Sequence, residues 1–142
     1  MEGRDTTRAT SIAANADTKL LGAATVMAFA ATSDGHRARA FYEGTLGLRV
    51  LSDDDFAMAL DANGVMLRVQ KVEAVTPPPY TVLGWQVADI AATLGALRKR
   101  GARSETFPGM NQDDDGIWHA PSGALVAWFK DPDGNTLSLT QM

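Results

Sequence analysis

An order of elements that occurs twice is the feature that most constrains how this chain can fold. In the first half, an apolar run of strand length over residues 24–31 precedes Asp34 and an amphipathic helix. In the second half, a similar run over residues 81–88 precedes Asp89 and a second amphipathic helix. Asp is a preferred helix N-cap, and the two caps are 89 − 34 = 55 positions apart. The pattern therefore predicts two copies of one strand–helix unit.

Each half also ends with a glycine turn and a strand. Asp61–Ala62–Asn63–Gly64 precedes an expected strand over residues 65–70, and Asp131–Pro132–Asp133–Gly134 precedes one over residues 135–141. The turns are 131 − 61 = 70 positions apart, so the second copy holds 70 − 55 = 15 extra residues before its last hairpin. Such turns are common on their own, but element order, turn chemistry and spacing agree here. We therefore interpret the two halves as a duplication.

The remaining strands and the boundary between the copies follow from local signals. Apolar runs predict two more strands in the first half and three in the second. Pro77–Pro78–Pro79 cannot join a central ladder, so these prolines mark the boundary. The further strands are expected over residues 48–52, 56–60, 102–107, 116–120 and 124–130, with a loop over 107–116. The expected organisation is a flexible tail over residues 1–21 and one domain over 22–142, made of modules over 22–73 and 80–142 joined by a Pro-rich linker over 74–79.

Charge and cysteine content exclude several classes of partner and site. The formal net charge is −4 and the pI is near 5.0, and an acidic surface repels nucleic acid and anionic membranes. No apolar run approaches the roughly 20 residues that span a bilayer. The chain has no cysteine, which excludes disulfides, thiolate metal sites and a cysteine nucleophile. We expect a cytoplasmic protein without a nucleic-acid or membrane partner.

Short strings in both halves resemble those of the vicinal oxygen chelate superfamily, which includes glyoxalase I, bleomycin-resistance proteins and extradiol dioxygenases. They are Ser33–Asp34, Arg39–Ala40–Phe41–Tyr42, Leu46–Gly47–Leu48, Val87–Ala88–Asp89–Ile90, Arg100–Gly101 and Phe129–Lys130–Asp131–Pro132–Asp133–Gly134–Asn135. The last string is the most specific, and the resemblance covers residues 24–142. It implies an α+β fold in which two βαβββ modules form an incomplete barrel around a cleft. It also implies a homodimer.

Enzymes of this superfamily bind one divalent metal with side chains from the first and last strand of each module. The resemblance places the four ligand positions at Met27, Arg68, Val82 and Ser138. These residues offer a soft thioether, a fixed cation, a hydrocarbon and a weak neutral oxygen, which do not suit a hard or borderline divalent metal. We therefore predict a protein that binds no metal and no cofactor.

The alternation of side chains along a strand predicts which residues face the cleft. Residues in phase with the four ligand positions give an apolar surface with few polar groups, as in small-molecule pockets. Arg68 is expected either to bind an anionic ligand or to form an internal salt bridge or a bond to Gln86. Trp118 is expected either to form a wall for a planar ligand or to pack in the core, Trp85 falls out of phase beneath a helix, and the face of Trp128 stays undecided. The predicted ligand-binding residues are Met27, Phe29, Met66, Arg68, Val82, Gln86, Trp118 and Ser138.

Three functional hypotheses follow. In the first, the chain binds a small apolar or aromatic molecule, anionic ones included, without a metal. In the second, it is a lyase, isomerase or dioxygenase-type enzyme of the same superfamily, with substitute metal ligands or with acid–base chemistry from Glu105, Asp115 or His119. In the third, it is a protein–protein interaction domain. The spacing assigns no catalytic residue: His36 and His119 fall outside the expected ligand strands, and the acidic run over 113–115 is either a cation site or a solvated loop.

Overall fold

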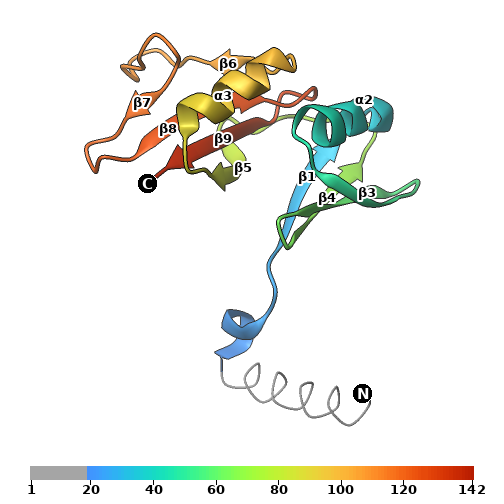
Figure 1. The fold of residues 1–142 in the computed structure, drawn as a ribbon. Helices are drawn as coiled ribbons and strands as arrows, with labels where there is room; N and C mark the ends of the chain where they lie inside the picture. The colour runs from blue at the N-terminus through green and yellow to red at the C-terminus, as the bar shows by residue number, and fades with distance from the viewer. Residues whose placement is uncertain (1–18) are drawn as a thin grey trace.

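The computed structural model describes residues 19–142, which form two separate β-sheets side by side (Figure 1). In the first sheet the strand order is β1-β4-β3-β2, with β1 parallel to β4 and the other neighbours antiparallel. Its strands are β1 (Met27–Thr32), β2 (Arg49–Asp53), β3 (Ala57–Ala62) and β4 (Val65–Lys71). We call these strands and the helix between β1 and β2 module one. Most of the tail predicted over 1–21 lies outside the described residues, and Leu20–Ala23 form one exposed turn, η1.

The second sheet repeats this order as β5-β9-β8-β6, again with one parallel pair followed by antiparallel pairs. Its strands are β5 (Thr81–Gln86), β6 (Ser104–Glu105), β8 (Leu125–Lys130) and β9 (Thr136–Gln141), and a short extra strand, β7 (Trp118–His119), also pairs with β8. We call this half module two. The observed arrangement confirms the predicted α+β fold of two βαβββ modules, and the two sheets do not close into a barrel.

The strand register reproduces both offsets of the sequence repeat. Phe29 on β1 pairs with Arg68 on β4, and Gly84 on β5 pairs with Ser138 on β9. Going from the first pair to the second adds 84 − 29 = 55 on the first strand and 138 − 68 = 70 on the last. These are the offsets of the N-cap aspartates and of the glycine turns. From Leu83 onward the two modules therefore share one register, and a bulge at Val82 shifts the start of β5 by one residue.

Several strands are shorter than their apolar runs suggest: the one predicted over 116–120 is reduced to Trp118–His119, and two others show what limits their length. The strand predicted over 24–31 begins only at Met27, because Met66 is the first β4 residue in the parallel ladder. The strand predicted over 102–107 is reduced to Ser104–Glu105, the only two residues of this segment that pair with β8. In both cases the length of the strand is set by how many residues of the partner strand can pair with it. The sequence of one strand alone does not reveal this number.

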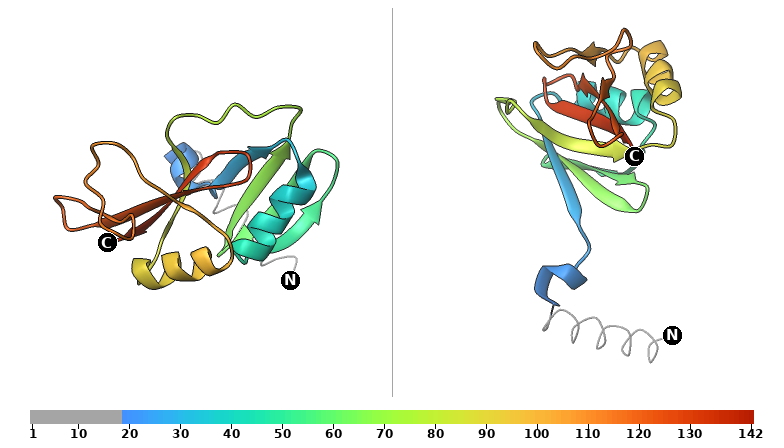
Figure 2. Two further views of the ribbon diagram at one scale, coloured as in Figure 1. Left: turned by 90° about the horizontal axis from the view of Figure 1, so that it is seen from above. Right: turned by 90° about the vertical axis from the view of Figure 1, so that its left-hand side faces the viewer.

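Both helices begin at the predicted aspartate caps. Asp34 Oδ1 accepts the backbone N–H of Arg37 at 3.1 Å, and Asp89 Oδ1 accepts that of Ala92 at 3.0 Å. The helices are α2 (Gly35–Arg39), its wider continuation η2 (Ala40–Thr45) and α3 (Ile90–Lys99). All three lie on one side of the two sheets, and no helix in the described part of the chain covers the opposite side (Figure 2).

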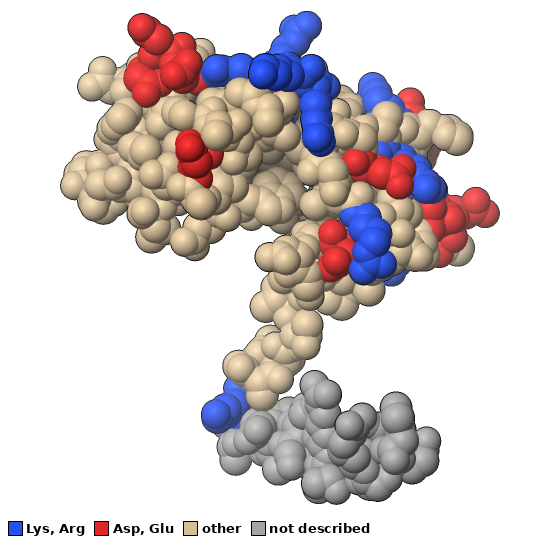
Figure 3. Space-filling view, in the orientation of Figure 1, with Lys and Arg blue, Asp and Glu red and all other residues tan. Residues whose placement is uncertain are grey.

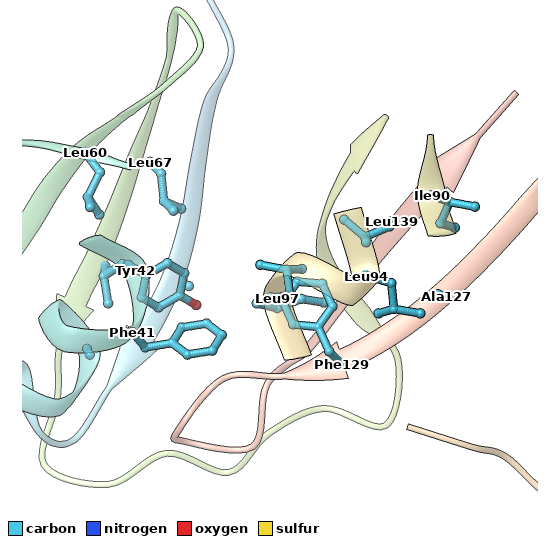
Figure 4. Packing of buried hydrophobic residues seen from close by; sticks show 14 of the residues in the cluster. Phe41, Tyr42, Leu60, Leu67, Ile90, Leu94, Leu97, Ala127, Phe129 and Leu139 are labelled. Atoms are coloured by element: carbon cyan, nitrogen blue, oxygen red, sulfur yellow. The ribbon is translucent and has the colours of Figure 1, made fainter. Parts of the chain in front are cut away.

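One apolar cluster fills the space between the helices and both sheets. Phe41 and Tyr42 reach it from module one, and Leu94 of α3 and Phe129 of β8 reach it from module two (Figure 4). The rings of Phe41 and Phe129 lie 6.4 Å apart, so the modules share a single core. Trp85 packs against this cluster with its ring stacked on Phe129, as its phase along β5 predicts.

Buried hydrogen bonds join the modules at the turn between β8 and β9. Asp131 Oδ2 accepts bonds from the Tyr42 hydroxyl at 2.7 Å and from Asn135 Nδ2 at 2.8 Å. Asn135 Nδ2 also donates to the carbonyl oxygen of Ala31 at 3.0 Å. Burial, together with the Asp131 charge, raises the pKa of Tyr42 well above its ordinary value, so its hydroxyl remains a donor. We call Tyr42, Asp131 and Asn135 the polar joint, and it gives the most specific sequence string a structural role.

Candidate functional site

The side of the sheets that the helices leave uncovered is the candidate site, and we call it the open face. Strand alternation assigns residues to it, because their neighbours in β4 and β9 are buried beneath the helices. Seven of the eight predicted ligand-binding residues lie on it: Met27, Phe29, Met66 and Arg68 in module one, and Gln86, Trp118 and Ser138 in module two. The eighth, Val82, falls at a bulge of β5 without a register partner and packs partly against the core cluster. Met27 is 44% and Phe29 49% exposed, so much of this apolar surface faces solvent in the single chain.

Arg68 lies at the centre of the open face of module one. Because β4 lies between β1 and β3, Arg68 has Phe29 as its register partner on one side and Ala59 on the other. Within residues 19–142, the half-buried Arg68 forms no side-chain hydrogen bond or ion pair, and the internal bond to Gln86 that the sequence leaves open is not made. A guanidinium in this position can accept a carboxylate or phenolate as its partner.

A cavity of about 400 Å³ lies where the edges of β1 and β5 meet, and we call it the cleft cavity. Phe29 from module one and Val82 from module two both line it, together with Gln70 and the start of the linker. Two predicted residues are therefore brought together across the module boundary, and Arg68 lies next to Phe29. The other predicted residues lie elsewhere on the open face.

Module two carries an aromatic cluster that the sequence predicts only in part. Trp128 pairs with Ser138 and therefore lies on the open face. Its ring centre is 6.3 Å from that of Trp118 and 5.4 Å from that of Phe107, which meets it edge-on. The hairpin register could have revealed the face of Trp128, because pairing across the 131–134 turn fixes every pair further along. Phe107 gives no such signal, since it lies in a loop.

A second cavity, of about 720 Å³, lies on the open face of module two, and we call it the linker cavity. Trp128 and Lys130 of β8 line one side of it. The linker residues Pro77–Pro79 and the loop residues Phe107 and Pro108 line the others. None of the eight predicted residues lines this cavity, and Pro78 is the one residue that lines both cavities.

The residues at the four predicted metal-ligand positions do not fit a divalent metal. Met27 and Val82 lie on the first strand of each module, and Arg68 and Ser138 lie on the last. Together they offer no carboxylate and no imidazole. Between residues 19 and 142, no group of three His, Cys, Asp or Glu side chains is close enough to hold a metal ion. The positions that would require metal-binding groups therefore carry other chemistry in this chain.

The acidic run before Trp118 organises its own loop. Asp113 Oδ1 accepts the backbone N–H groups of Asp115 and Ile117, both at 2.9 Å, and Oδ2 lies 3.1 Å from His119 Nε2. The bond from Ile117, followed by that from His119, lowers the pKa of Asp113. These contacts use the carboxylate within the loop and favour the loop interpretation of this run over a cation site.

Comparison with known proteins identifies a family for most of the chain. The family model described as the Glyoxalase/Bleomycin resistance protein/Dioxygenase superfamily matches residues 24–139. No curated protein matches this chain significantly. In the part of the chain that the structure describes, no helix is both long and apolar enough to pass through a membrane.

Solved structures with the same fold are distant in sequence. A glyoxalase family protein from Bacillus anthracis is 17% identical with a TM-score of 0.66, over 82% of this chain and 93% of that one. A glyoxalase/bleomycin resistance protein/dioxygenase from Alicyclobacillus acidocaldarius is 17% identical with a TM-score of 0.64, over 82% and 89%. A bleomycin-binding protein complexed with bleomycin is 22% identical with a TM-score of 0.63, over 83% and 98%. At these identities the similarity shows the fold.

Proposed function

The chain belongs to the glyoxalase/bleomycin resistance protein/dioxygenase superfamily, and on that basis we propose that it binds a small apolar or aromatic molecule in the cleft cavity without a metal. The observation that carries the proposal is that Phe29 and Val82, from different modules, line one cavity on the open face. An apolar concave surface with a few polar groups is the usual composition of a small-molecule site. A bleomycin-binding protein with this fold, solved with bleomycin, supports ligand binding as a use of the architecture.

Arg68 gives the proposed site a preference for an anionic group. It is half-buried beside Phe29 and makes no ion pair with any residue between 19 and 142. A partly desolvated guanidinium without a partner is costly, and a ligand carboxylate or phenolate can satisfy it with two parallel hydrogen bonds. The ligand therefore combines an apolar body with one acidic group.

The proposal includes a homodimer, because the apolar open face is contiguous and exposed. Met27, Phe29 and Met66 are neighbours on β1 and β4, and each is at least one third exposed. The segment 20–32 that leads into and forms β1 carries no charged residue, and its surface shows none in Figure 3. Contiguous apolar patches of this kind mark interaction surfaces, and a two-fold pair can cover the same patch on both copies. Sedimentation equilibrium of the full chain measures this directly.

Thermal shift with a panel of aromatic acids and with bleomycin tests ligand binding, because a ligand of the native state raises its Tm. An aromatic acid that binds in the cleft cavity raises the Tm of the wild type. It should bind the Arg68→Met variant at least about 10-fold more weakly than the wild type. Arg49→Met is the matched control, since Arg49 lies on the same module, is largely exposed and pairs with Asp61 at 3.4 Å. Equal effects of the two substitutions, or no shift with any compound, would contradict the proposal.

A further inference from the structure

We propose that the linker cavity of module two is a second binding pocket, distinct from the cleft cavity, for a flat aromatic carboxylate. Its volume of about 720 Å³ lies within the range of roughly 300–1,000 Å³ that is typical of small-molecule pockets. The aromatic ring of the ligand would lie against Trp128, and its carboxylate would face Lys130. The proposal rests on the two ordered walls of this cavity, on the chemistry of its lining residues and on its separation from the cleft cavity.

The first wall of the cavity is the proline linker, which has a stiff backbone and packs against the turn between β8 and β9. Three consecutive prolines fix the backbone of Pro77–Pro79, which all line the cavity. Gly134, in the turn between β8 and β9, has a φ of +88°, and a Cβ built there would lie 3.2 Å from Pro77 Cγ. The linker therefore packs closely on the turn, and a side chain at position 134 would require Pro77 to move by a few tenths of an ångström. A wall ordered before the ligand arrives lowers the entropy cost of binding.

The second wall is the loop between β6 and β7, and one glutamine side chain orders it. Gln112 Oε1 accepts the backbone N–H of Phe107 at 2.8 Å. Gln112 Nε2 donates to the carbonyl oxygens of Glu105 at 3.0 Å and Gly116 at 2.7 Å. These bonds fasten both ends of the loop and hold Phe107 edge-on to Trp128. The loop lies in the stretch that module two has and module one lacks, so the extra residues build a wall of the pocket.

The lining chemistry identifies the class of ligand. Prolines and aromatic rings dominate it, which suits a flat apolar body that stacks on Trp128. Lys130 is the single charged residue among the lining residues. Its ion pair with Glu105 has an Nζ–Oε1 distance of 3.5 Å, and both side chains are partly exposed, so the pair is weak and Lys130 remains available to an anion. One cation beside an aromatic wall points to a monoanionic aromatic acid.

The linker separates this pocket from the cleft cavity. The two cavities share only Pro78, and neither Arg68 nor Phe29 lines the linker cavity. The linker arches over the side of the sheets opposite the helices (Figure 2). Lys130 lines only the linker cavity of these two, and Arg68 lies beside the cleft cavity as the register partner of Phe29, so substitution of Arg68 or of Lys130 reports on one site at a time.

The test compares two probes that differ in one group, 2-naphthoate and 2-naphthalenemethanol, in calorimetric titrations of the full chain. We expect 2-naphthoate to bind more tightly than the alcohol, and Lys130→Met to weaken the acid by about 3- to 10-fold while leaving the alcohol unchanged. Trp128→Leu should weaken both probes by about 10-fold, since both stack on the ring. Lys99→Met, at the end of α3, is the matched charge control. Trp128→Phe keeps an aromatic ring and should retain most of the binding.

Three results would overturn the proposal. The first is no binding of either probe, and the second is loss of 2-naphthoate binding in Lys99→Met as large as in Lys130→Met. The third is loss of 2-naphthoate binding in Arg68→Met but not in Lys130→Met, which would place the acid in the cleft cavity. That third result would support the proposed function while removing the second pocket, so the two failures are distinguishable. Unfolding curves of each variant, measured in parallel, show whether a loss of binding comes from a loss of folded protein.

Discussion

Modules one and two have the same strand order and equivalent registers, yet their open faces differ in chemistry. In module one, Phe29 on the first strand is the register partner of Arg68 on the last strand, and the surface around them is open to solvent. In module two, the equivalent pair is Gly84 beside Ser138, and Trp128 of β8, part of the aromatic cluster, is the partner of Ser138 on its other side. The linker and the loop after β6 then enclose Trp128 on two sides. The repeated frame determines which residues face the site, and the segments outside the repeat determine what the site can hold.

The modules also differ in how their glycine turns are used. Asp61 and Asp131 are equivalent positions, 70 residues apart, and each accepts a backbone N–H from its own turn. Asp61 is solvent-accessible and serves only its turn and an exposed ion pair with Arg49. Asp131 is 5% exposed and also receives the Tyr42 hydroxyl from module one. The turn of module one connects two strands, whereas the equivalent turn of module two also joins the two modules.

The largest expected effect comes from removing these two equivalent carboxylates. Asp131→Ala leaves the Tyr42 hydroxyl and the Asn135 amide without their buried acceptor, and we expect a loss of about 3–5 kcal/mol in the free energy of unfolding. Asp61→Ala should cost about 1 kcal/mol. Urea unfolding monitored by circular dichroism measures both. Equal losses of stability in the two variants would mean that the two turns have the same role. Tyr42→Phe removes only the hydrogen bond from the Tyr42 hydroxyl to Asp131, and we expect it to cost about 1 kcal/mol.

A second prediction concerns the equivalent positions 29 and 84. A Cβ at Gly84 would lie 2.5 Å from Ser138 Oγ, so Gly84→Ala forces the Ser138 side chain out of its present position and should cost about 1–3 kcal/mol. Removing the hydroxyl with Ser138→Ala in the same chain should restore most of that loss. Phe29→Ala acts on an exposed ring and should cost about 1 kcal/mol or less. Thermal unfolding of the three variants measures these effects, and a double variant as unstable as Gly84→Ala would show that the Ser138 hydroxyl is not the obstacle.

The smallest expected effect is on the stability of the fold at acid pH. Burial raises the pKa of Asp133, but the hydrogen bonds from the backbone N–H and hydroxyl of Ser33 and the charge of Arg37 outweigh it and hold the pKa below its usual 3.8. A carboxyl whose pKa is lower in the folded state stabilises the fold above the unfolded pKa, and this contribution disappears as the pH falls through the folded pKa. The equivalent residue of module one is Asn63, since 133 − 70 = 63.

Asp133→Asn therefore gives module two the residue of module one. Its stability should fall less than that of the wild type when unfolding is measured from about pH 6 down to about pH 3. Near neutral pH the asparagine can still accept from Ser33, whose backbone N–H and hydroxyl lie 2.9 Å and 3.0 Å from Asp133 Oδ1. A parallel acid dependence in the two proteins would show that Asp133 does not contribute to acid sensitivity.

The sequence predicts the frame of this molecule much better than its pockets. Periodicity and the caps Asp34 and Asp89 are local signals, so helix positions and the order of elements along the chain follow from them. Strand alternation then assigns Arg68 and Ser138 to the open face, but it does not reveal the bulge at Val82. The linker cavity is different, because it depends on how Pro77 packs on Gly134 and how Gln112 folds its loop. Those contacts join segments far apart in the sequence, and neither segment has a periodic pattern that announces its partner.

The place of the last strand in each sheet has a consequence for the order of events during synthesis. β4 and β9 come last in their modules but lie second in their sheets, so β1 and β5 remain unpaired until those strands emerge. The loops that must close span 66 − 27 = 39 and 136 − 81 = 55 residues. The longer loop costs only about 0.3 kcal/mol more in closure entropy, so the two closures differ mainly in when their strands are synthesised. Tyr42 is made 89 residues before Asp131, the buried acceptor of its hydroxyl.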